Sequence, residues 1–280
     1  MKIITNGLSI VATPIGNLDD ISIRAINVLK ECDVIICENP KHSLKLLNKL
    51  GIKKKLIALH DYNEHLIIEK IKNLLENKNC ALISDAGSPL ISDPGYKLVQ
   101  YCIKNNIKIT SIPGPSSIIS SLQLSGLPVS EFIFFGFIPK SKKRLNDLIK
   151  NIVKERKTSI FLVSNHKLIT FIESLEKIVP ARTISVCKEL TKINETVYRG
   201  VSRIVKIDIL EKKENLRGEF VVIVNGQTLE NQDFEEIDFY KKELKKLSTK
   251  FSLTDIVEIV HKFTKINKNK IYKWLLKLKK

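Results

Sequence analysis

Hydrophobic and polar positions alternate along the first half of the chain in blocks that switch between two periods. Short apolar runs, LSIVAT, VIICEN, KKLIALH, CALISD and IKITSI, have the length and β-branched content of buried strands. Between them, residues 21–33, 42–51, 64–78 and 97–106 repeat apolar positions at the spacing of amphipathic helices. A strand-then-helix order repeated this often favours a mostly parallel, doubly wound sheet.

A second block begins after residue 113. Ser116 is placed as the N-cap of a helix that runs to Leu124, and Gly126 with Pro128 supplies its stop. Further alternating elements are then expected, as strands at 132–137, 159–164, 182–190 and 218–226, a basic turn followed by a helix within 139–155, and a helix at 167–178. The sequence therefore predicts two α/β domains, at residues 1–113 and 114–227.

The remaining residues, 228–280, have a different composition. QTLENQDFEEIDF is polar and acidic, which is typical of a linker, and SLTDIVEIVHKFTKINKNKIYKWLLKLKK predicts two helices separated by KINKNK. Ser252 or Thr254 is expected to cap the first of them. The pair is either a helix-turn-helix hairpin or a basic two-helix cap packed on its own domain, and the sequence leaves both open.

Composition narrows the class of protein. The 280 residues are 43% hydrophobic, enough for a sizeable core, and no apolar run approaches the roughly 20 residues of a spanning helix. The N-terminus lacks a secretory cleavage site, so we expect a cytoplasmic protein without a membrane partner. The five cysteines are scattered without a CxxC pair and the five histidines are dispersed, which predicts buried, reduced thiols and no metal site.

The net charge of +17 indicates a polyanionic partner. The alternative is compositional, because AT-rich genomes favour Lys, Ile and Asn. The distribution supports a functional basic segment, since residues 241–280 hold thirteen lysines against Glu243, Asp255 and Glu258 and so carry +10 of the +17.

Several common site motifs are missing. The chain has no GxxxxGK[ST] phosphate loop, no GxGxxG after its first strand and no GxSxG elbow. Nucleotide hydrolysis, nicotinamide chemistry and serine hydrolysis on those templates are therefore poorly supported.

The loop SDAGSPLISDPG, at residues 84–95, is the first candidate site. Glycine permits positive φ, proline fixes φ, and aspartate and serine bond nearby backbone groups. Loops at the carboxyl ends of parallel strands are where open α/β sheets bind ligands. The alternative is an ordinary connection from a strand to a helix.

Five segments in order carry a resemblance to a known family: VATPIGNLDDISIRAINVLKECDVIICEN, LISDAGSPLISDPG, SIPGPSSIISSLQLSGLP, FFGFIPKSKKR and KELTKINETVYRG. Together they resemble the members of the tetrapyrrole (corrin/porphyrin) methylase superfamily that modify ribosomal RNA, over residues 8–226. The resemblance implies two α/β domains with S-adenosylmethionine in the cleft between them, a homodimer, and a basic C-terminal appendage. It also implies methyl transfer to the ribose 2′-oxygen of a decoding-centre cytidine in 16S rRNA, within the assembled small subunit and with no DNA partner.

The same resemblance implies which residues contact the cofactor. The counterpart of GSPLIS supplies backbone and small side-chain contacts in this superfamily, and the turns after the first strand and after PGP contribute further. The expected cofactor-binding residues are Pro14, Gly16, Asp85, Gly87, Ser88, Ile91 and Ser116.

Methyl transfer from a sulfonium needs chiefly orientation, although a base or a cation helps a ribose hydroxyl to react. The resemblance favours Glu189 and Lys192 of KELTK for this role, with Lys188 and Glu195 beside them. The alternative is a solvated strand end with ordinary ion pairs. A second candidate group is His60, Asn63 and Glu64 of HDYNE, where a structural histidine is the competing interpretation.

Two loops depart from the family pattern. An acid-Asp-Thr-Arg run is replaced by Glu38, Asn39, Pro40 and Lys41, and a Glu-x-Pro-His-Arg run is replaced by residues 163–167, VSNHK. Lysine lacks the planar fork of arginine, and Val163 removes a carboxylate. These changes question the roles of both loops.

Two further hypotheses compete with rRNA methylation. The same fold could methylate a tetrapyrrole or precorrin, which the basic charge and the C-terminal segment disfavour. The chain could also be a non-catalytic RNA-binding assembly factor, which the intact GSPLIS loop disfavours. For RNA, the electrostatic candidates are the C-terminal lysines and the PKSKKR turn, with Lys140, Lys142, Lys143 and Arg144.

Overall fold

The structure is a computed structural model, and it describes residues 6–60, 62–211, 216, 218–227, 244, 246–247, 251–264 and 266–279. For residues 277–279 it describes the backbone alone. Its contacts divide the chain into two compact units. The first contains Met1–Leu124, Cys187–Val197 and Gly218–Val221, and the second contains Ser125–Val186, Tyr198–Arg217 and Val222–Lys280. The expected domain boundaries at residues 113 and 227 stay predictions.

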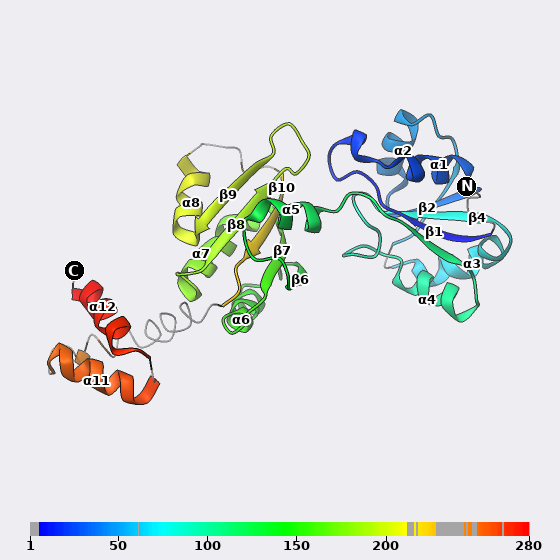
Figure 1. The fold of residues 1–280 in the computed structure, drawn as a ribbon. Coiled ribbons are helices and arrows are strands. Elements are labelled where there is room, and N and C mark those ends of the chain that lie inside the picture. The colour runs from blue at the N-terminus through cyan, green and yellow to red at the C-terminus, as the bar shows by residue number, and fades with distance from the viewer. Residues whose placement is uncertain are drawn as a thin grey trace. The chain divides into compact units, whose positions relative to one another are not determined.

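The first unit is built on a five-stranded sheet in the order β3-β2-β4-β1-β5 (Figure 1). Its strands are β1 (Gly7–Val11), β2 (Val34–Cys37), β3 (Lys55–Ala58), β4 (Asn79–Ile83) and β5 (Ile109–Ile112). All four neighbouring pairs are parallel. The predicted parallel sheet is therefore confirmed.

Helices cover both faces of this sheet (Figure 1). Helices α1 (Ile23–Glu31) and α2 (Pro40–Lys49) pack on one face, and α3 (Glu64–Asn77) and α4 (Tyr96–Lys104) pack on the other. Strand β2 shows how period 2 divides the core, since Ile35 and Cys37 face α1 and α2 while Val34 and Ile36 face α3 and α4. Burial on both faces explains why these strands read as continuous apolar runs.

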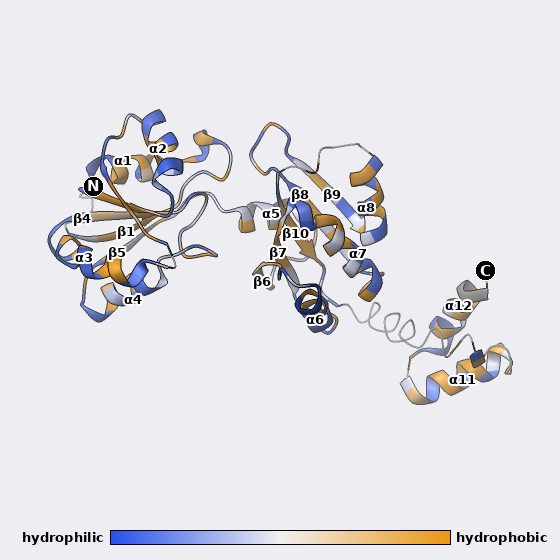
Figure 2. Cartoon of the chain, turned by 180° about the vertical axis from the view of Figure 1, so that it is seen from behind, coloured by the Kyte–Doolittle hydropathy of each residue, from blue (hydrophilic) through white to orange (hydrophobic). Residues whose placement is uncertain are grey.

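The second sheet has the order β6-β7-β10-β8-β9. Its strands are β6 (Phe132–Phe137), β7 (Thr158–Ser164), β8 (Thr183–Lys188), β9 (Thr196–Val201) and β10 (Glu219–Val224). Helices α6 (Lys142–Ile152), α7 (Leu168–Ile178) and α8 (Ser202–Glu211) accompany them, with a single 3₁₀ turn at Asn165–Lys167. The first unit also contains a 3₁₀ turn at Leu18–Asp20 and, apart from its last residue, helix α5 (Ser117–Ser125). In Figure 2 the strands of both sheets are predominantly hydrophobic, while the exposed sides of the helices are hydrophilic.

The sequence missed β9 and α8. Strand β9 is at the edge of its sheet and is only half buried, and α8 leaves Ile204, Ile207 and Leu210 partly exposed. Neither segment therefore shows a clean apolar period. The helix expected to start after Ser116 is confirmed, because the Ser116 carbonyl accepts from Ser120 N–H at 2.9 Å.

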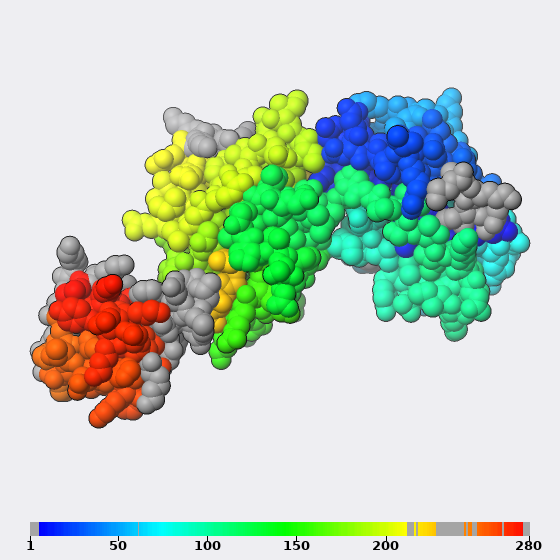
Figure 3. Space-filling model, in the orientation of Figure 1, coloured from blue at the N-terminus to red at the C-terminus, as the bar shows by residue number. Residues whose placement is uncertain are grey.

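The C-terminal residues form a helical hairpin of α11 (Leu253–Thr264) and α12 (Lys268–Lys279), whose side chains pack into one body (Figure 3). Ser252 is the predicted N-cap, since its hydroxyl accepts from Asp255 N–H and the Asp255 carboxylate accepts in return from Ser252 N–H, both at 3.2 Å. The second helix starts earlier than predicted, at Lys268, because the Asn267 side chain accepts from Asn269 N–H at 2.9 Å. The predicted acidic linker, apart from Gln227, lies outside the described residues.

The cysteines are free and buried, as predicted. Burial raises the pKa of the Cys32 and Cys102 thiols to about 11 and that of Cys80 to about 12, which makes them inert. Among the described residues, no cluster of His, Cys, Asp or Glu side chains is placed to hold a metal ion. None of the described helices is long and apolar enough to cross a membrane.

Candidate functional site

The turns that follow β1 and β4 are bonded to each other. Thr13 and Gly87 exchange backbone hydrogen bonds of 2.9 and 3.0 Å, and the Thr13 hydroxyl donates to the Ser84 carbonyl at 3.3 Å. Gly87 has φ of 78°, a conformation that glycine adopts without a steric cost. The carboxyl ends of the two central strands are therefore joined into one rigid rim, and the backbone of Gly87 is already committed to it.

Backbone strain is concentrated at two loops of the first unit. Six described residues other than glycine have positive φ, and two of them, Asn6 and Asn106, are of the type that tolerates it. The other four are Leu90 at 73°, Ser92 at 70°, Glu189 at 50° and Thr191 at 64°. Such outliers persist only where the surroundings hold them, and they gather at binding and catalytic sites. They single out the loops at residues 84–95 and 189–195.

Asp85 has an acceptor that nothing in the described part of the chain satisfies. Its Oδ1 is buried and lacks a hydrogen-bond partner there. Burial, and after it the charge of Asp85, raise the pKa of the neighbouring Asp93 carboxyl, although a hydrogen bond from Ser84 opposes them. A buried carboxylate oxygen without a donor is costly, so this loop is suited to a ligand that brings a donor.

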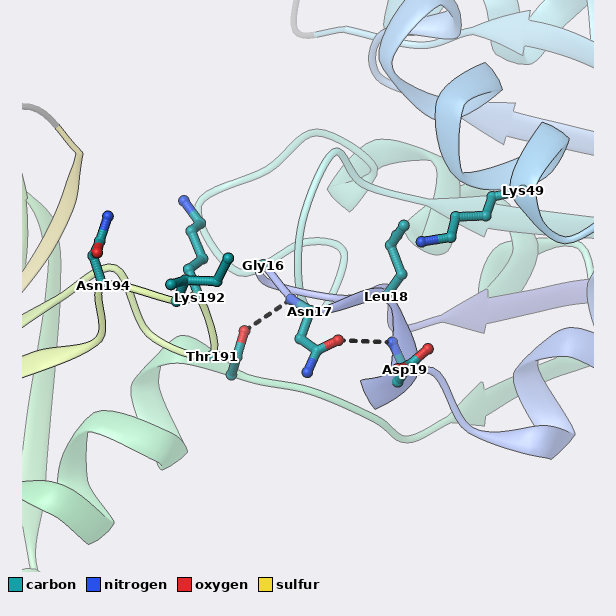
Figure 4. A pocket seen from close by; sticks show the side chains of 9 residues that line it. Gly16, Asn17, Leu18, Asp19, Lys49, Thr191, Lys192 and Asn194 are labelled. Atoms are coloured by element: carbon teal, nitrogen blue, oxygen red, sulfur yellow. Dashed lines mark hydrogen bonds between the residues drawn. The ribbon is translucent and has the colours of Figure 1, made fainter.

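The turn after β8 closes against the turn after β1. The Thr191 hydroxyl accepts from Asn17 N–H at 3.0 Å (Figure 4). Thr191 N–H in turn donates to the Glu195 carboxylate at 2.7 Å. Gly16 leaves no room for a side chain, because an added Cβ would lie 2.6 Å from Lys192 Cγ and 2.8 Å from the Leu190 carbonyl oxygen. This close approach explains the glycine at position 16.

Lys192 forms an ion pair with two carboxylates. Its Nζ is 3.0 Å from Glu189 Oε1 and 3.2 Å from Glu219 Oε2, and Glu189 also accepts from Glu219 N–H at 2.9 Å. Burial opposes charge on both Glu189 and Lys192, but the hydrogen bonds and opposite charges outweigh it. The pKa of Glu189 is therefore lowered and that of Lys192 raised. Both groups stay charged near neutral pH, so Lys192 provides a fixed cation and Glu189 is a poor proton acceptor.

A cavity of about 460 Å³ opens beside these turns, lined by residues 16–19, Lys49 and residues 191–194. Lys49 and Lys192 lie on either side of residues 16–18 (Figure 4). Asn17 and Asn194 add amide groups, and Asp19 adds a carboxylate. A cavity whose walls carry two lysines and two amide groups is suited to an anionic, hydroxyl-rich ligand.

The structure brings several predicted site residues together in the first unit. Gly16 and Lys192 line the cavity, and Glu189 contacts Lys192. Pro14 and Lys188 are buried beside these turns, Ser88 is half buried, and Ile91 is 50% exposed. Ser116 caps α5, with its hydroxyl 3.5 Å from Ile119 N–H. The cofactor and catalytic roles of all ten residues stay predictions.

The HDYNE segment has structural contacts that account for two of its candidates. Glu64 is buried and its carboxylate accepts from Leu98 N–H at 2.9 Å, which caps α4 in place of the missing side chain of Gly95. Asn63 accepts from His60 N–H at 2.8 Å and donates to the Ala58 carbonyl. A site role for the exposed His60 ring stays a prediction.

The two departures from the family pattern fit the local fold. Asn39 caps α2, where its side chain accepts from Lys41 and His42 N–H, and Pro40 occupies the first turn of that helix. Val163 is 2% exposed within β7, so a carboxylate there would be buried. Both loops are therefore well formed without the family's charged residues.

The PKSKKR turn has an unusual placement. Lys142, Lys143 and Arg144 form the first turn of α6, where the helix dipole disfavours cations, and they are exposed together with Lys140. Their charge is unfavourable for the isolated helix, which supports an anionic partner at this surface.

The sequence missed most of the cavity wall. Asn17, Asp19 and Thr191 lie within quoted motifs, so adjacency to Gly16 and Lys192 was the available signal. No signal in the sequence indicated Lys49. It lies in the last turn of α2, and only the packing of that helix brings it to the cavity.

Comparisons with known proteins identify the family of the chain. The profile of the Tetrapyrrole (Corrin/Porphyrin) Methylases matches residues 7–204. The chain is 37% identical to Ribosomal RNA small subunit methyltransferase I of Haemophilus influenzae, over 98% of both chains. It is 41% identical to the protein of that name from Thermotoga maritima, over 79% of this chain and 98% of the relative.

A solved structure is also similar. Uroporphyrin-III-C-methyltransferase from Thermus thermophilus superposes with a TM-score of 0.55 over 79% of this chain and 94% of its own, at 17% sequence identity. At that identity the likeness concerns the fold alone. It confirms the predicted fold class.

Proposed function

The chain belongs to the tetrapyrrole (corrin/porphyrin) methylases, in the group of ribosomal RNA small subunit methyltransferase I, and from this premise we propose that it methylates 16S rRNA. The acceptor is the ribose 2′-oxygen of a decoding-centre cytidine, cytidine 1402. The observation that carries the proposal is near full-length similarity to enzymes named for ribosomal RNA, against 17% identity to a porphyrin enzyme. The basic C-terminal segment and the PKSKKR turn support an RNA substrate.

S-adenosylmethionine is the proposed methyl donor. The unsatisfied Asp85 carboxylate oxygen, in a loop strained at Leu90 and Ser92, fits a ligand with ammonium or hydroxyl donors. We assign cofactor contacts to Pro14, Gly16, Asp85, Gly87, Ser88, Ile91 and Ser116. When bound, the cofactor supplies a methyl group on an electrophilic sulfonium.

The residues of this chain then orient and polarise the acceptor. The cavity walls, tied together between Asn17 and Thr191, hold the ribose in position, and orientation of this kind provides much of the rate. Lys192 stays protonated between Glu189 and Glu219, so it is suited to stabilise negative charge developing on the 2′-oxygen. Lys188 is buried at the end of β8, next to the same turn.

The proposed setting of the reaction follows from its substrate. We place the enzyme in the cytoplasm, acting as a homodimer on 16S rRNA within the assembled small subunit. Exposed lysines suit recognition by phosphate and ribose contacts, since RNA is read largely by shape.

The test is label transfer from radiolabelled S-adenosylmethionine. Purified protein is incubated with small subunits that lack the modification, with free 16S rRNA, and with a porphyrinogen. Transfer to subunits alone is the expected result. Transfer to the porphyrinogen would favour the tetrapyrrole hypothesis instead.

A matched pair of variants tests the cofactor assignment. Asp85→Asn should weaken cofactor binding in calorimetry about tenfold or more, because a charged acceptor is lost. Asp33→Asn, at an exposed aspartate before β2, is the control and should bind as wild type does. If neither the wild type nor the control variant binds the cofactor, the result would favour a non-catalytic assembly factor.

A further inference from the structure

The C-terminal hairpin has a buried core, to which Leu244 also contributes, and a capped first helix. Ile256, Ile271 and Trp274 are buried between its helices, and the Ser252–Asp255 capping box closes the start of α11. The His261 ring bonds the Ile266 carbonyl across the turn at 2.7 Å. The fold of the hairpin therefore does not depend on the side chains that it leaves exposed.

The charge of the hairpin is strongly one-sided. Residues 251–280 contain eight lysines and two acids. Both acids are engaged inside the hairpin, since Asp255 completes the cap and Glu258 is 3.1 Å from the amine of Lys268. Lys262 and Lys273 are exposed, so their positive charge is directed at solvent.

Aromatic side chains stand beside these lysines. Phe263 is 85% exposed and follows Lys262 in the last turns of α11, and Tyr272 is 42% exposed and precedes Lys273 on α12. A phenylalanine this exposed contributes almost nothing to the core, while the same hairpin buries Trp274 and six aliphatic side chains.

We propose that this hairpin binds an unpaired segment of RNA through four exposed side chains, Lys262, Phe263, Tyr272 and Lys273, together called the hairpin surface. Lysines attract the phosphates, and aromatic rings provide flat faces on which unpaired bases stack. A base-paired helix keeps its bases stacked internally, so it would use the lysines only. The combination of both groups therefore favours a single-stranded segment over a duplex or an acidic protein surface.

The inference rests on the proposed function for the identity of the RNA but concerns a separate surface of the chain. Its role is to hold the substrate, so the effect belongs in substrate affinity and not in the chemical step. Loss of the surface should raise KM for small subunits and leave kcat unchanged.

The test compares Phe263→Ala with a matched control in the full-length protein. Ile103→Ala is the control, because Ile103 is also an exposed apolar residue beside a lysine in the last turn of a helix. Binding of a fluorescent single-stranded oligonucleotide with the decoding-region sequence is measured by anisotropy, with a duplex of the same sequence alongside. Loss of one stacked base predicts a 5- to 150-fold weaker single-strand affinity for Phe263→Ala, with duplex affinity within twofold.

The charged residues are tested by salt dependence. Lys262→Gln with Lys273→Gln should reduce the slope of log affinity against log salt by about 1.4, because each single-strand phosphate contact contributes about 0.7. Phe263→Ala should leave that slope unchanged. Equal affinity of Phe263→Ala and wild type for the single strand would overturn the proposal, as would an equal loss for single strand and duplex.

The same measurements separate this inference from the proposed function. If wild type methylates small subunits and Phe263→Ala binds RNA normally, only the hairpin surface is wrong. If wild type transfers no methyl group while Phe263→Ala loses single-strand affinity, only the reaction is wrong. If the variant instead loses binding to ribosomal proteins and keeps RNA affinity, the partner is a protein and the proposal fails.

Discussion

The two ends of strand β8 differ in how they hold a positive charge. At its amino end, Arg182 is fully buried, and its guanidinium donates to the carbonyls of Ile152, Val153, Glu155 and Asn225. At its carboxyl end, Lys192 is partly exposed and balanced by two carboxylates on a strained turn. Both cations are well bonded, and the second lies beside a cavity.

We interpret the difference as a structural role for Arg182 and a functional role for Lys192. The Arg182 fork satisfies carbonyls at the end of α6 that would otherwise be buried without donors. The turn at Lys192 keeps its polar groups near solvent and holds Glu189 and Thr191 at positive φ. Ligand sites of α/β sheets occupy the carboxyl ends of strands, so stability is expected to depend on one end and activity on the other.

The largest expected effect concerns the amino end. Arg182→Met removes the donors from four backbone carbonyls and should lower the free energy of unfolding by about 3–5 kcal/mol. Chemical denaturation measures it, and the protein that remains folded should keep its kcat. Arg24→Met, which removes a more exposed bond of 2.6 Å to the Ser111 carbonyl, is the control and should cost about 1 kcal/mol. Equal losses for both variants would contradict a special role for Arg182.

The next effect concerns the carboxyl end. In Gly16→Ala the new Cβ would overlap Lys192 Cγ and the Leu190 carbonyl, which forces the two turns apart. We expect kcat/KM for methyl transfer to fall about 100-fold, because a displacement of this size misplaces the acceptor.

Its control is Gly51→Ala, where φ is +68° and nothing lies within 4 Å of the added Cβ. This variant should lose about 1–2 kcal/mol of stability from backbone strain and no activity. A fully active Gly16→Ala would show that the turns tolerate separation.

A smaller effect tests the HDYNE segment. Glu64→Ala removes the carboxylate that caps α4 and should lower the free energy of unfolding by about 1–2 kcal/mol, since the Leu98 N–H loses its acceptor. The kcat of methyl transfer should stay at the wild-type value. A loss of kcat with unchanged stability would instead return this segment to the list of catalytic candidates.

The smallest effect is on pH dependence. The lowered pKa of Glu189 stabilises the fold above its unfolded value of 4.5, and this contribution is lost as pH falls through the folded value. The raised pKa of Lys192 stabilises below 10.5, and this contribution is lost as pH rises through its folded value.

Lys192→Met should therefore cost about 1 kcal/mol between these limits and less as pH falls below 4.5 toward the folded pKa of Glu189. Denaturation at pH 7 and at pH 3 measures the difference. A cost that is the same at both pH values would contradict the ion pair.

The sequence predicted the first unit better than the second for a physical reason. Strands β1, β2 and β4 are buried on both faces, so their apolar runs were unmistakable. Strand β9 is half exposed at a sheet edge, and α8 leaves Ile204 and Leu210 at the surface, so their patterns were weak. Periodicity detects elements only where burial is regular.

The sequence likewise predicted some residues of the candidate site and missed others. Gly16, Asp85 and Lys192 lie in quoted motifs and were predicted, although their roles remain to be tested. Lys49 was not predicted, because only the packing of α2 brings it to the cavity. The structural role of Glu64 also escaped the sequence, since its partner, Leu98, is 34 residues away.

The most direct test of the central claim is to identify the modified atom. Small subunits lacking the modification are incubated with the protein and S-adenosylmethionine, and the 16S rRNA is then digested and analysed by mass spectrometry. The account predicts one new 2′-O-methylcytidine, at position 1402 of the decoding centre, which Gly16→Ala strongly reduces and Gly51→Ala does not. A methyl group on a base, or at a nucleotide outside the decoding centre, would contradict the account.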